Sequence, residues 1–206
     1  MTDTKEKILD AAEQLIGEQG YAATSLRHVI AEAGVNLAAV HYHFGSKEGL
    51  LDAVVARKVT PVNEARLALL DRVEAEAGSG PPDVEKVLEA LLIPTAAAAS
   101  RSPEFVRLMG RMHSEGMMPQ LVEKHFRAVG LRFVAALRRA LPELPEEELL
   151  WRVHFMMGAM AHAMCIAPVF PQMAGDATDM EPRMQRLVTF LGAGFRAPAT
   201  AGKQRK

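Results

Sequence analysis

Several features that would place the chain outside the cell or in a membrane are missing from its sequence. Cys165 is the only cysteine, so no disulfide can form within the chain. The start, MTDTKEK, is polar where a signal peptide needs an apolar stretch. The most apolar run, residues 155–168, is interrupted by His162 and is shorter than the roughly 20 residues that span a bilayer. We expect a cytoplasmic protein without a membrane segment.

An excess of charge of one sign is also missing. The formal net charge is -1 over 206 residues, so the overall electrostatics indicate neither a nucleic-acid binder nor a membrane binder. Any basic surface must therefore be local. Apolar residues make up 49% of the chain and charged residues 24%, which is typical of a soluble globular protein.

Motifs that carry catalysis are missing as well. The sequence has no Gly-rich phosphate loop, no GxSxG elbow and no CxxC pair. Four histidines are spread over three predicted helices, with no pair four residues apart as in HExxH: His113, His125, His154 and His162. We expect no enzyme activity, no metal and no cofactor. A helical enzyme that uses these histidines is the alternative from a different functional class.

Helical periodicity runs through the chain, and no alternation of apolar and polar residues is long enough to indicate a sheet. The prediction is therefore an all-α fold. Glycine and cap-forming residues mark the expected ends of the first helices. The expected helices are one at 3–19 ended by Gly20, a short one capped by Thr24 and ended by Gly34, one at 37–43 capped by Asn36, a long one capped by Ser46 that Pro61 bends or divides, and helices at 83–100, 104–115, 119–140, 146–167 and 180–196.

The two short helices at about 24–34 and 37–43, joined by a turn of three or four residues, describe a helix-turn-helix. A helix of two turns is too short to be stable alone, so Val35, Val40 and Phe44 are predicted to hold it by facing inward. Small residues on the opposite face allow it to enter a DNA major groove, with cations on either side for phosphates. The predicted DNA-binding residues are Arg27, Asn36, Leu37, Ala38, Ala39, His41, Tyr42, His43 and Lys47.

A metal site is the alternative for His41 and His43. Alternate residues on a helix point about 200° apart, and no further ligands follow at a suitable spacing, so this arrangement disfavours a metal ion.

The segment KILDAAEQLIGEQGYAATSLRHVIAEAGVNLAAVHYHFGSKEGLL resembles the N-terminal domain of TetR-family transcriptional repressors. The resemblance covers about residues 5–54 and rests on ILDAA, the Gly20-Tyr21 turn, AGV at 33–35 and the YHFGSKEGL ending. It implies that the helix at 36–42 reads the major groove, that Tyr42 and Lys47 contact phosphates, and that the protein is a homodimer.

The segment LLWRVHFMMGAMAHAM, at 149–164, resembles the corresponding segment of PsrA-type members of that family, which respond to long-chain fatty acids. Eleven of the twelve methionines lie beyond residue 100. A gap-filling core explains them as well as a deformable apolar pocket does. If a pocket exists, Arg107, Arg111 or His113 could hold a polar head group. The predicted pocket residues are Phe105, Met109, Met112, His113, Met117, Phe126, Trp151, Phe155, Met156 and Met160.

The last two long helices carry small residues and an apolar stripe at spacings of three and four, which indicates a two-fold four-helix dimer interface. The alternative is a core buried within one subunit. The predicted interface residues are Gly158, Ala159, Ala163, Met184, Leu187, Val188, Leu191 and Phe195.

Together these patterns predict a DNA-binding domain at 1–48, a ligand-binding and dimerisation domain at 49–196, and a disordered basic tail at 197–206. We expect a ligand-responsive transcriptional regulator, a repressor that a hydrophobic effector releases from a near-palindromic operator. A long-chain fatty acid or acyl-CoA is the expected effector. The same fold could instead sense a drug-like or aromatic ligand, or act as an activator.

Overall fold

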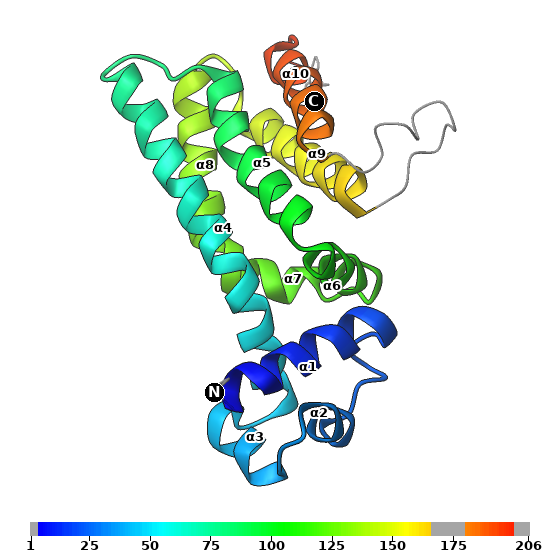
Figure 1. Ribbon diagram of the computed structural model, residues 1–206. Helices are drawn as coiled ribbons and strands as arrows, with labels where there is room; N and C mark the ends of the chain where they lie inside the picture. Colours follow the sequence, from blue (N-terminus) through cyan, green and yellow to red (C-terminus); the bar gives the residue numbers. More distant parts are fainter. Residues whose placement is uncertain (1–3, 166–179, 200–206) are drawn as a thin grey trace, which may run out of the picture. The chain divides into compact units, whose positions relative to one another are not determined.

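The computed structural model describes residues 4–165 and 180–199, and within them the all-α prediction is confirmed (Figure 1). None of the described helices has an apolar stretch long enough to cross a membrane. Residues 166–167, expected to end a helix, and residues 200–206 of the expected tail lie outside the described residues. The helices are α1 (Thr4–Gln19), α2 (Leu26–Ala33), α3 (Leu37–Phe44), α4 (Lys47–Ala77), α5 (Val84–Arg101), α6 (Pro103–Ser114), α7 (Met118–Leu121), α8 (Arg127–Ala140), α9 (Glu146–Cys165) and α10 (Met180–Arg196).

The Thr24 cap was predicted wrongly, and the structure defines two other details of the helix prediction more closely. Ser25 caps α2, because its hydroxyl accepts a hydrogen bond from the His28 amide at 3.2 Å, whereas Thr24 is buried and donates to the Gly20 carbonyl. Pro61 does not divide α4, which is one helix of 31 residues; buried Val59 and Val62 hold it on either side of the proline. The helix expected at 119–140 contains a π-helical turn, Val122–Phe126, between α7 and α8.

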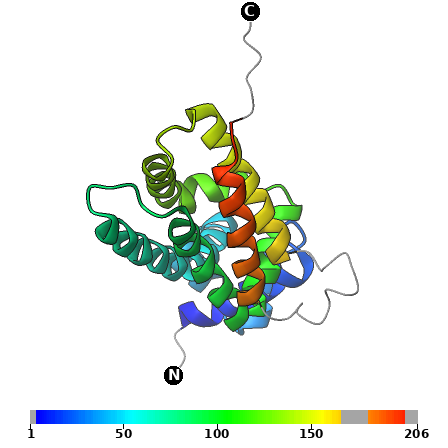
Figure 2. The same cartoon turned by 90° about the horizontal axis from the view of Figure 1, so that it is seen from above.

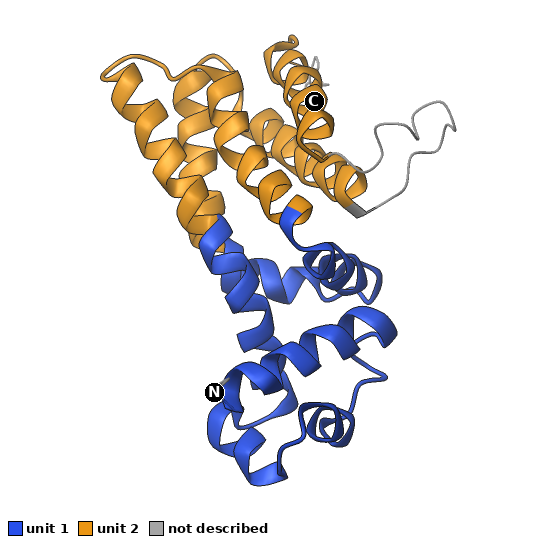
Figure 3. Ribbon diagram, viewed as in Figure 1, with its two compact units in different colours: residues 1–62, 101–126 blue, residues 63–100, 127–206 orange. Residues whose placement is uncertain are grey.

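The chain packs into two compact units (Figure 3). Unit 1 consists of residues 1–62 and 101–126, and unit 2 of residues 63–100 and 127–206. Helix α4 therefore contributes its first half to unit 1 and its second half to unit 2. The boundary falls after Val62, one residue beyond Pro61, where the sequence indicated a bend or a break.

Unit 1 is organised around α1, which packs against α2, α3 and α6. Ile8, Ala12 and Ile16 are buried on the inner face of α1. Glu13 is also buried, and its carboxylate accepts from Arg57 at 2.6 Å and from Lys58 at 2.8 Å. Because both cations are on α4, this buried ion cluster ties α1 to the first half of α4.

Unit 2 places α9 and α10 side by side (Figures 1 and 2). Arg152 of α9 is 8% exposed, and its guanidinium donates to the carbonyls of Gly194, Phe195, Ala197 and Pro198 at 2.7 to 3.1 Å. The last carbonyls of a helix have no partner within the helix, so Arg152 satisfies the end of α10. The Glu148 carboxylate, 2.8 Å away, balances its charge.

Substitution of Arg152 by methionine should destabilise unit 2, because the carbonyls at the end of α10 lose their donors and Glu148 loses its counter-ion. We expect a loss of about 3 kcal/mol in the free energy of unfolding, measured by urea denaturation at constant protein concentration. Arg138→Met is the control: this side chain is half exposed and pairs with exposed Glu146, so its loss should cost less than about 1 kcal/mol. Equal losses for the two variants would contradict the assigned role of Arg152.

Candidate nucleic-acid interface

The turn between α2 and α3 is built by two residues, Gly34 and Asn36, whose contacts are local. Gly34 ends α2 in the left-handed region, at φ 64°, where a side chain would be strained, and its amide donates to the Ile30 carbonyl. The Asn36 side chain accepts from the Ala39 amide at 2.9 Å, which confirms it as the cap of α3. The direction in which α3 leaves the turn is therefore set by hydrogen bonds within residues 30–39.

The two-turn helix α3 is held in place by packing at its centre and at its end. Val40 is fully buried, while Val35 and Phe44 are half-buried. Gly49, in the first turn of α4, lies so close to the end of α3 that an added Cβ would be 2.1 Å from the Phe44 carbonyl oxygen. Only glycine fits there, so the end of α3 determines which residue can stand at position 49 of α4.

The remaining face of α3 is open to solvent. Tyr42 is 85% exposed and Leu37 is 49% exposed, and Ala38 and His41 are exposed between them. These four residues lie at spacings of one, four and five and so share one side of the helix. Of the other predicted DNA-binding residues, Asn36 and Arg27 are exposed, and Ala39, His43 and Lys47 are half-buried.

His41 has one ring nitrogen already in use. Its Nδ1 is 2.9 Å from the carbonyl oxygen of Gly45. A carbonyl oxygen only accepts, so in the neutral ring the proton is on Nδ1 and Nε2 is left as an acceptor. An acceptor at this position is suited to the amino group of adenine or cytosine in a major groove, and not to guanine O6 or N7.

Lys47 also has part of its bonding capacity in use. Its ammonium donates to the Tyr21 carbonyl at 2.6 Å and lies 4.2 Å from the centre of the Tyr21 ring. This contact fixes the first turn of α4 to the turn that follows α1. An ammonium has three donors, so two remain for the predicted phosphate contact of Lys47.

Two residues of the segment 103–115 help to position the helix-turn-helix, a role that the sequence did not indicate. Arg111 of α6 donates to the Glu18 carbonyl at 2.7 Å, and both carboxylate oxygens of Glu115 accept from the Tyr21 amide at 3.1 and 3.2 Å. They bind the end of α1 and the turn after it. Arg111, considered from the sequence as a head-group donor, is thus occupied by main-chain oxygen.

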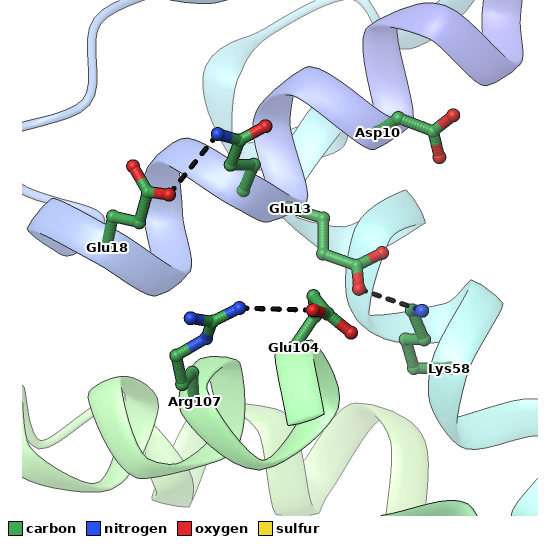
Figure 4. A pocket seen from close by; sticks show the side chains of 7 residues that line it. Asp10, Glu13, Glu18, Lys58, Glu104 and Arg107 are labelled. Atoms are coloured by element: carbon green, nitrogen blue, oxygen red, sulfur yellow. Dashed lines mark hydrogen bonds and ion pairs between the residues drawn. The ribbon is translucent and has the colours of Figure 1, made fainter. Parts of the chain in front are cut away.

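A charged cavity of about 460 Å³ lies between α1, α4 and α6 (Figure 4). Its charged groups all have partners: Glu13 pairs with Lys58, and Glu104 pairs with Arg107. Asp10 pairs with Arg57, and Glu18 accepts a hydrogen bond from Gln14. In the described ranges no three His, Cys, Asp or Glu side chains gather as a metal ion would require. The cavity therefore has no group that calls for a ligand, and it is not formed by the open face of α3.

The predicted pocket residues are divided between the two units. In unit 1, Phe105 and Met112 are buried, Met109, Met117 and Phe126 are half-buried, and His113 is exposed. In unit 2, Met156 is buried and Met160 half-buried, whereas Trp151 and Phe155 are 52% and 63% exposed. Each unit thus buries part of the set, and the two large aromatic rings of α9 face solvent in the single chain.

The residues predicted for a dimer interface have two different environments. Met184, Val188, Leu191 and Phe195 are buried inside unit 2, which is the alternative that the sequence left open for this stripe. Gly158 is exposed, and Ala159, Ala163 and Leu187 are half-buried. The large apolar side chains that the described parts of α9 and α10 present to solvent are Leu150, Trp151, Phe155 and Phe190. Trp151 and Phe155, one turn apart, stack with ring centres 5.7 Å from each other.

Comparison with protein families gives two matches. Residues 8–54 match the model of bacterial regulatory proteins of the tetR family, and residues 85–194 match the model of the tetracyclin repressor-like C-terminal domain. The HTH-type transcriptional regulator BetI of Rhizobium meliloti (strain 1021) is 32% identical over 118 residues, which cover 51% of this chain and 56% of BetI. The chain thus spans about half the length of this curated relative.

Solved structures with the same fold cover nearly the whole chain. SmeT, the repressor of the Stenotrophomonas maltophilia multidrug efflux pump SmeDEF, is 26% identical with a TM-score of 0.65 over 98% of this chain and 97% of its own. A complex of SmeT with triclosan has 24% identity and a TM-score of 0.67, covering 98% of this chain and 99% of that one. The fatty acid degradation regulator FadR from Bacillus halodurans has 17% identity and a TM-score of 0.59, covering 96% and 99%.

The N-terminal match ends just inside α4, and the C-terminal match runs from the start of α5 almost to the end of α10. Together with the capped helix-turn-helix, these matches place the chain in a single family of regulators. The protein belongs to the TetR family of transcriptional regulators.

Proposed function

We propose that the protein is a homodimeric repressor that binds a near-palindromic operator with α3 in the major groove and that a hydrophobic effector releases it. Residues 1–48 would form the DNA-binding domain, and residues 49–196 the ligand-binding and dimerisation domain. The observation that carries the proposal is the open face of α3: Ala38, His41 and Tyr42 are exposed on one side of a helix whose buried Val40 anchors it.

The chemistry of that face suits a DNA duplex. The small side chains of Ala38 and Ala39 would let the helix approach the groove floor, and the His41 acceptor would face base edges. The Tyr42 hydroxyl, Arg27 and the free donors of Lys47 would bind phosphates at the groove walls. In a dimer, two such helices about 34 to 36 Å apart would read successive turns of the duplex, which requires a near-palindromic site.

The dimer surface that best supports the proposal is the accessible side of α9 and α10. Leu150, Trp151, Phe155 and Phe190 are 49 to 71% exposed on two adjacent helices. Large apolar side chains left in solvent usually mark an interface, and a two-fold axis beside α9 and α10 would bury them in both copies. Gly158, Ala159 and Ala163 on α9 would permit close helix approach there.

The proposed effector is a long-chain fatty acid or acyl-CoA, as the PsrA-type resemblance of residues 149–164 suggests. That subgroup assignment stays a prediction. A drug-like aromatic effector is the second candidate, which the similarity to SmeT and its triclosan complex supports. In either case the effector must bind the non-DNA-binding conformation better, and a preference of about 1.4 kcal/mol lowers operator affinity tenfold.

A gel shift with DNA from the protein's own upstream region tests the function. The wild type should bind at low salt, and Tyr42→Phe should weaken binding about five- to tenfold through the loss of one hydroxyl hydrogen bond to phosphate. Tyr42 is 85% exposed, so the free energy of unfolding should stay within about 0.5 kcal/mol of wild type. Tyr21→Phe, which removes a hydroxyl bonded to Glu48, is the control with unchanged DNA affinity. Failure of the wild type to bind would overturn the proposal.

Two substitutions of Asn36 separate its structural role from a contact with DNA. Asn36→Ala removes the cap of α3 and should cost about 1 kcal/mol of stability as well as operator affinity. Asn36→Ser keeps a cap oxygen but has no amide group, so stability should be retained while affinity falls. Thermal unfolding and gel shifts on both variants give the comparison; full affinity in Asn36→Ser would limit Asn36 to capping.

Charge placed on the proposed dimer surface should separate the subunits. Phe155→Glu puts a carboxylate among the exposed aromatic rings of α9 and should shift the protein from dimer to monomer in sedimentation equilibrium. The control is Leu131→Glu on α8, because Leu131 is exposed to a similar extent, 61% against 63%, but lies on another helix. If Phe155→Glu remained as dimeric as Leu131→Glu, the interface would have to lie elsewhere.

A further inference from the structure

Three ionised side chains are buried in the described part of the chain, and they differ in how their charge is balanced. Glu13 has Arg57 and Lys58 beside it, and Arg152 has Glu148. Arg66, which is 4% exposed, forms no ion pair with any carboxylate in residues 4–165 or 180–199. A buried charge without a counter-ion is costly, so it is rarely kept without a use.

The groups around Arg66 bind its guanidinium without neutralising it. Nε donates to the Leu91 carbonyl at 2.9 Å, Nη1 to Asn63 Oδ1 at 3.1 Å and Nη2 to Thr95 Oγ1 at 2.6 Å. Asn63 and Thr95 are themselves buried, so three of the six polar or charged residues buried within residues 4–165 and 180–199 gather at this one point. All three oxygens are neutral, and they hold the guanidinium in a fixed orientation.

The guanidinium keeps unused donors. Of its five N–H groups, three serve these oxygens, which leaves one on each of Nη1 and Nη2. Near Nη2 is the Met160 sulfur at 3.9 Å, a weak acceptor on a flexible side chain. Burial lowers the pKa of Arg66 to about 10, so the group still carries its positive charge at neutral pH.

The surroundings of this cluster along the same helices are apolar. Leu70 on α4, Leu88 on α5 and Met156 on α9 each lie about one turn from a residue of the cluster, and all three are buried. A ligand that reached the guanidinium from within unit 2 would therefore meet apolar side chains on all three helices beside the cluster. This combination suits an amphiphilic anion.

We infer that Arg66 binds the carboxylate of the effector within unit 2, with Nη1 and Nη2 donating to the anion and Met160 displaced from Nη2. The inference rests on the proposed function, since it specifies the effector that would release the operator. It also selects among effectors: a carboxylic acid with an apolar body is favoured over a neutral analogue, and a cationic one is excluded by the buried positive charge.

The head-group donors considered from the sequence are placed differently. Arg107 is exposed and paired with Glu104, Arg111 is bonded to main-chain carbonyls, and His113 is exposed. The sequence does not single out Arg66, because one arginine in a helix is typical of a solvated surface residue. Only its burial and the neutrality of its partners distinguish it.

The test compares three ligands with the same decyl chain, decanoate, 1-decanol and decyltrimethylammonium, by calorimetric titration of the full chain without DNA. Wild type should bind decanoate about tenfold more tightly than decanol, the gain expected of a charge-assisted hydrogen bond, and should not bind the cation. Arg66→Met should bind decanoate and decanol equally. Arg66→Lys keeps the charge and should keep a preference for the acid.

Arg132→Met is the matched control, because Arg132 lies in the same unit but is half exposed and paired with Asp71 and Glu74; it should retain the preference for the acid. Wild-type protein that binds decanol as tightly as decanoate, or that binds neither, would overturn the inference even if Arg66→Met failed to fold. So would a folded Arg66→Met that still prefers the acid. Operator binding is measured separately: a protein that prefers decanoate but binds no upstream DNA would refute the proposed function and leave the anion site standing.

Discussion

The short length of α3 is the constraint on which the structure of the DNA-binding head depends. Eight residues make too few hydrogen bonds to offset the entropy of nucleating a helix, so α3 exists only in contact with its neighbours. Three contacts hold the helix in place. Asn36 caps its first turn, Val40 is buried beneath it, and Gly49 has no side chain and so lets α4 pack closely against its end. Helix α1 supplies the surface beneath, and the buried Glu13 cluster holds α1 to α4.

Buried charge is used in three ways in this chain. The Glu13 cluster joins two helices through opposite charges, and Arg152 completes the hydrogen bonds at the end of α10. Both arrangements are closed, since every charge has its counter-charge. The Arg66 site is open in the sense that its positive charge is not balanced, because its partners supply hydrogen bonds but no negative charge. The difference between closed and open sites separates residues that serve the fold from one that can serve a ligand.

Features set by neighbours in the chain were predictable, and features set by distant segments were not. The glycine that ends α2, the Asn36 cap and the range of α10 follow from local patterns, and the structure confirms them. An apolar stripe such as Met184 to Phe195 looks the same in sequence whether it packs on its own subunit or on a second copy. The hydrogen bonds of Lys47 to Tyr21 and of Arg66 to Thr95 join residues more than 20 positions apart, so no local sequence pattern predicts them.

The division of α3 into an anchored side and an open side has a consequence for how such regulators diverge. Ala38 and Tyr42 are exposed and support nothing beneath them, so replacing them leaves the free energy of folding almost unaltered. Natural selection can therefore change the preferred operator in single steps without first restoring stability. Two copies of a duplicated gene could acquire separate target promoters through a few codons, while the residues that hold the helix remain under constant purifying selection.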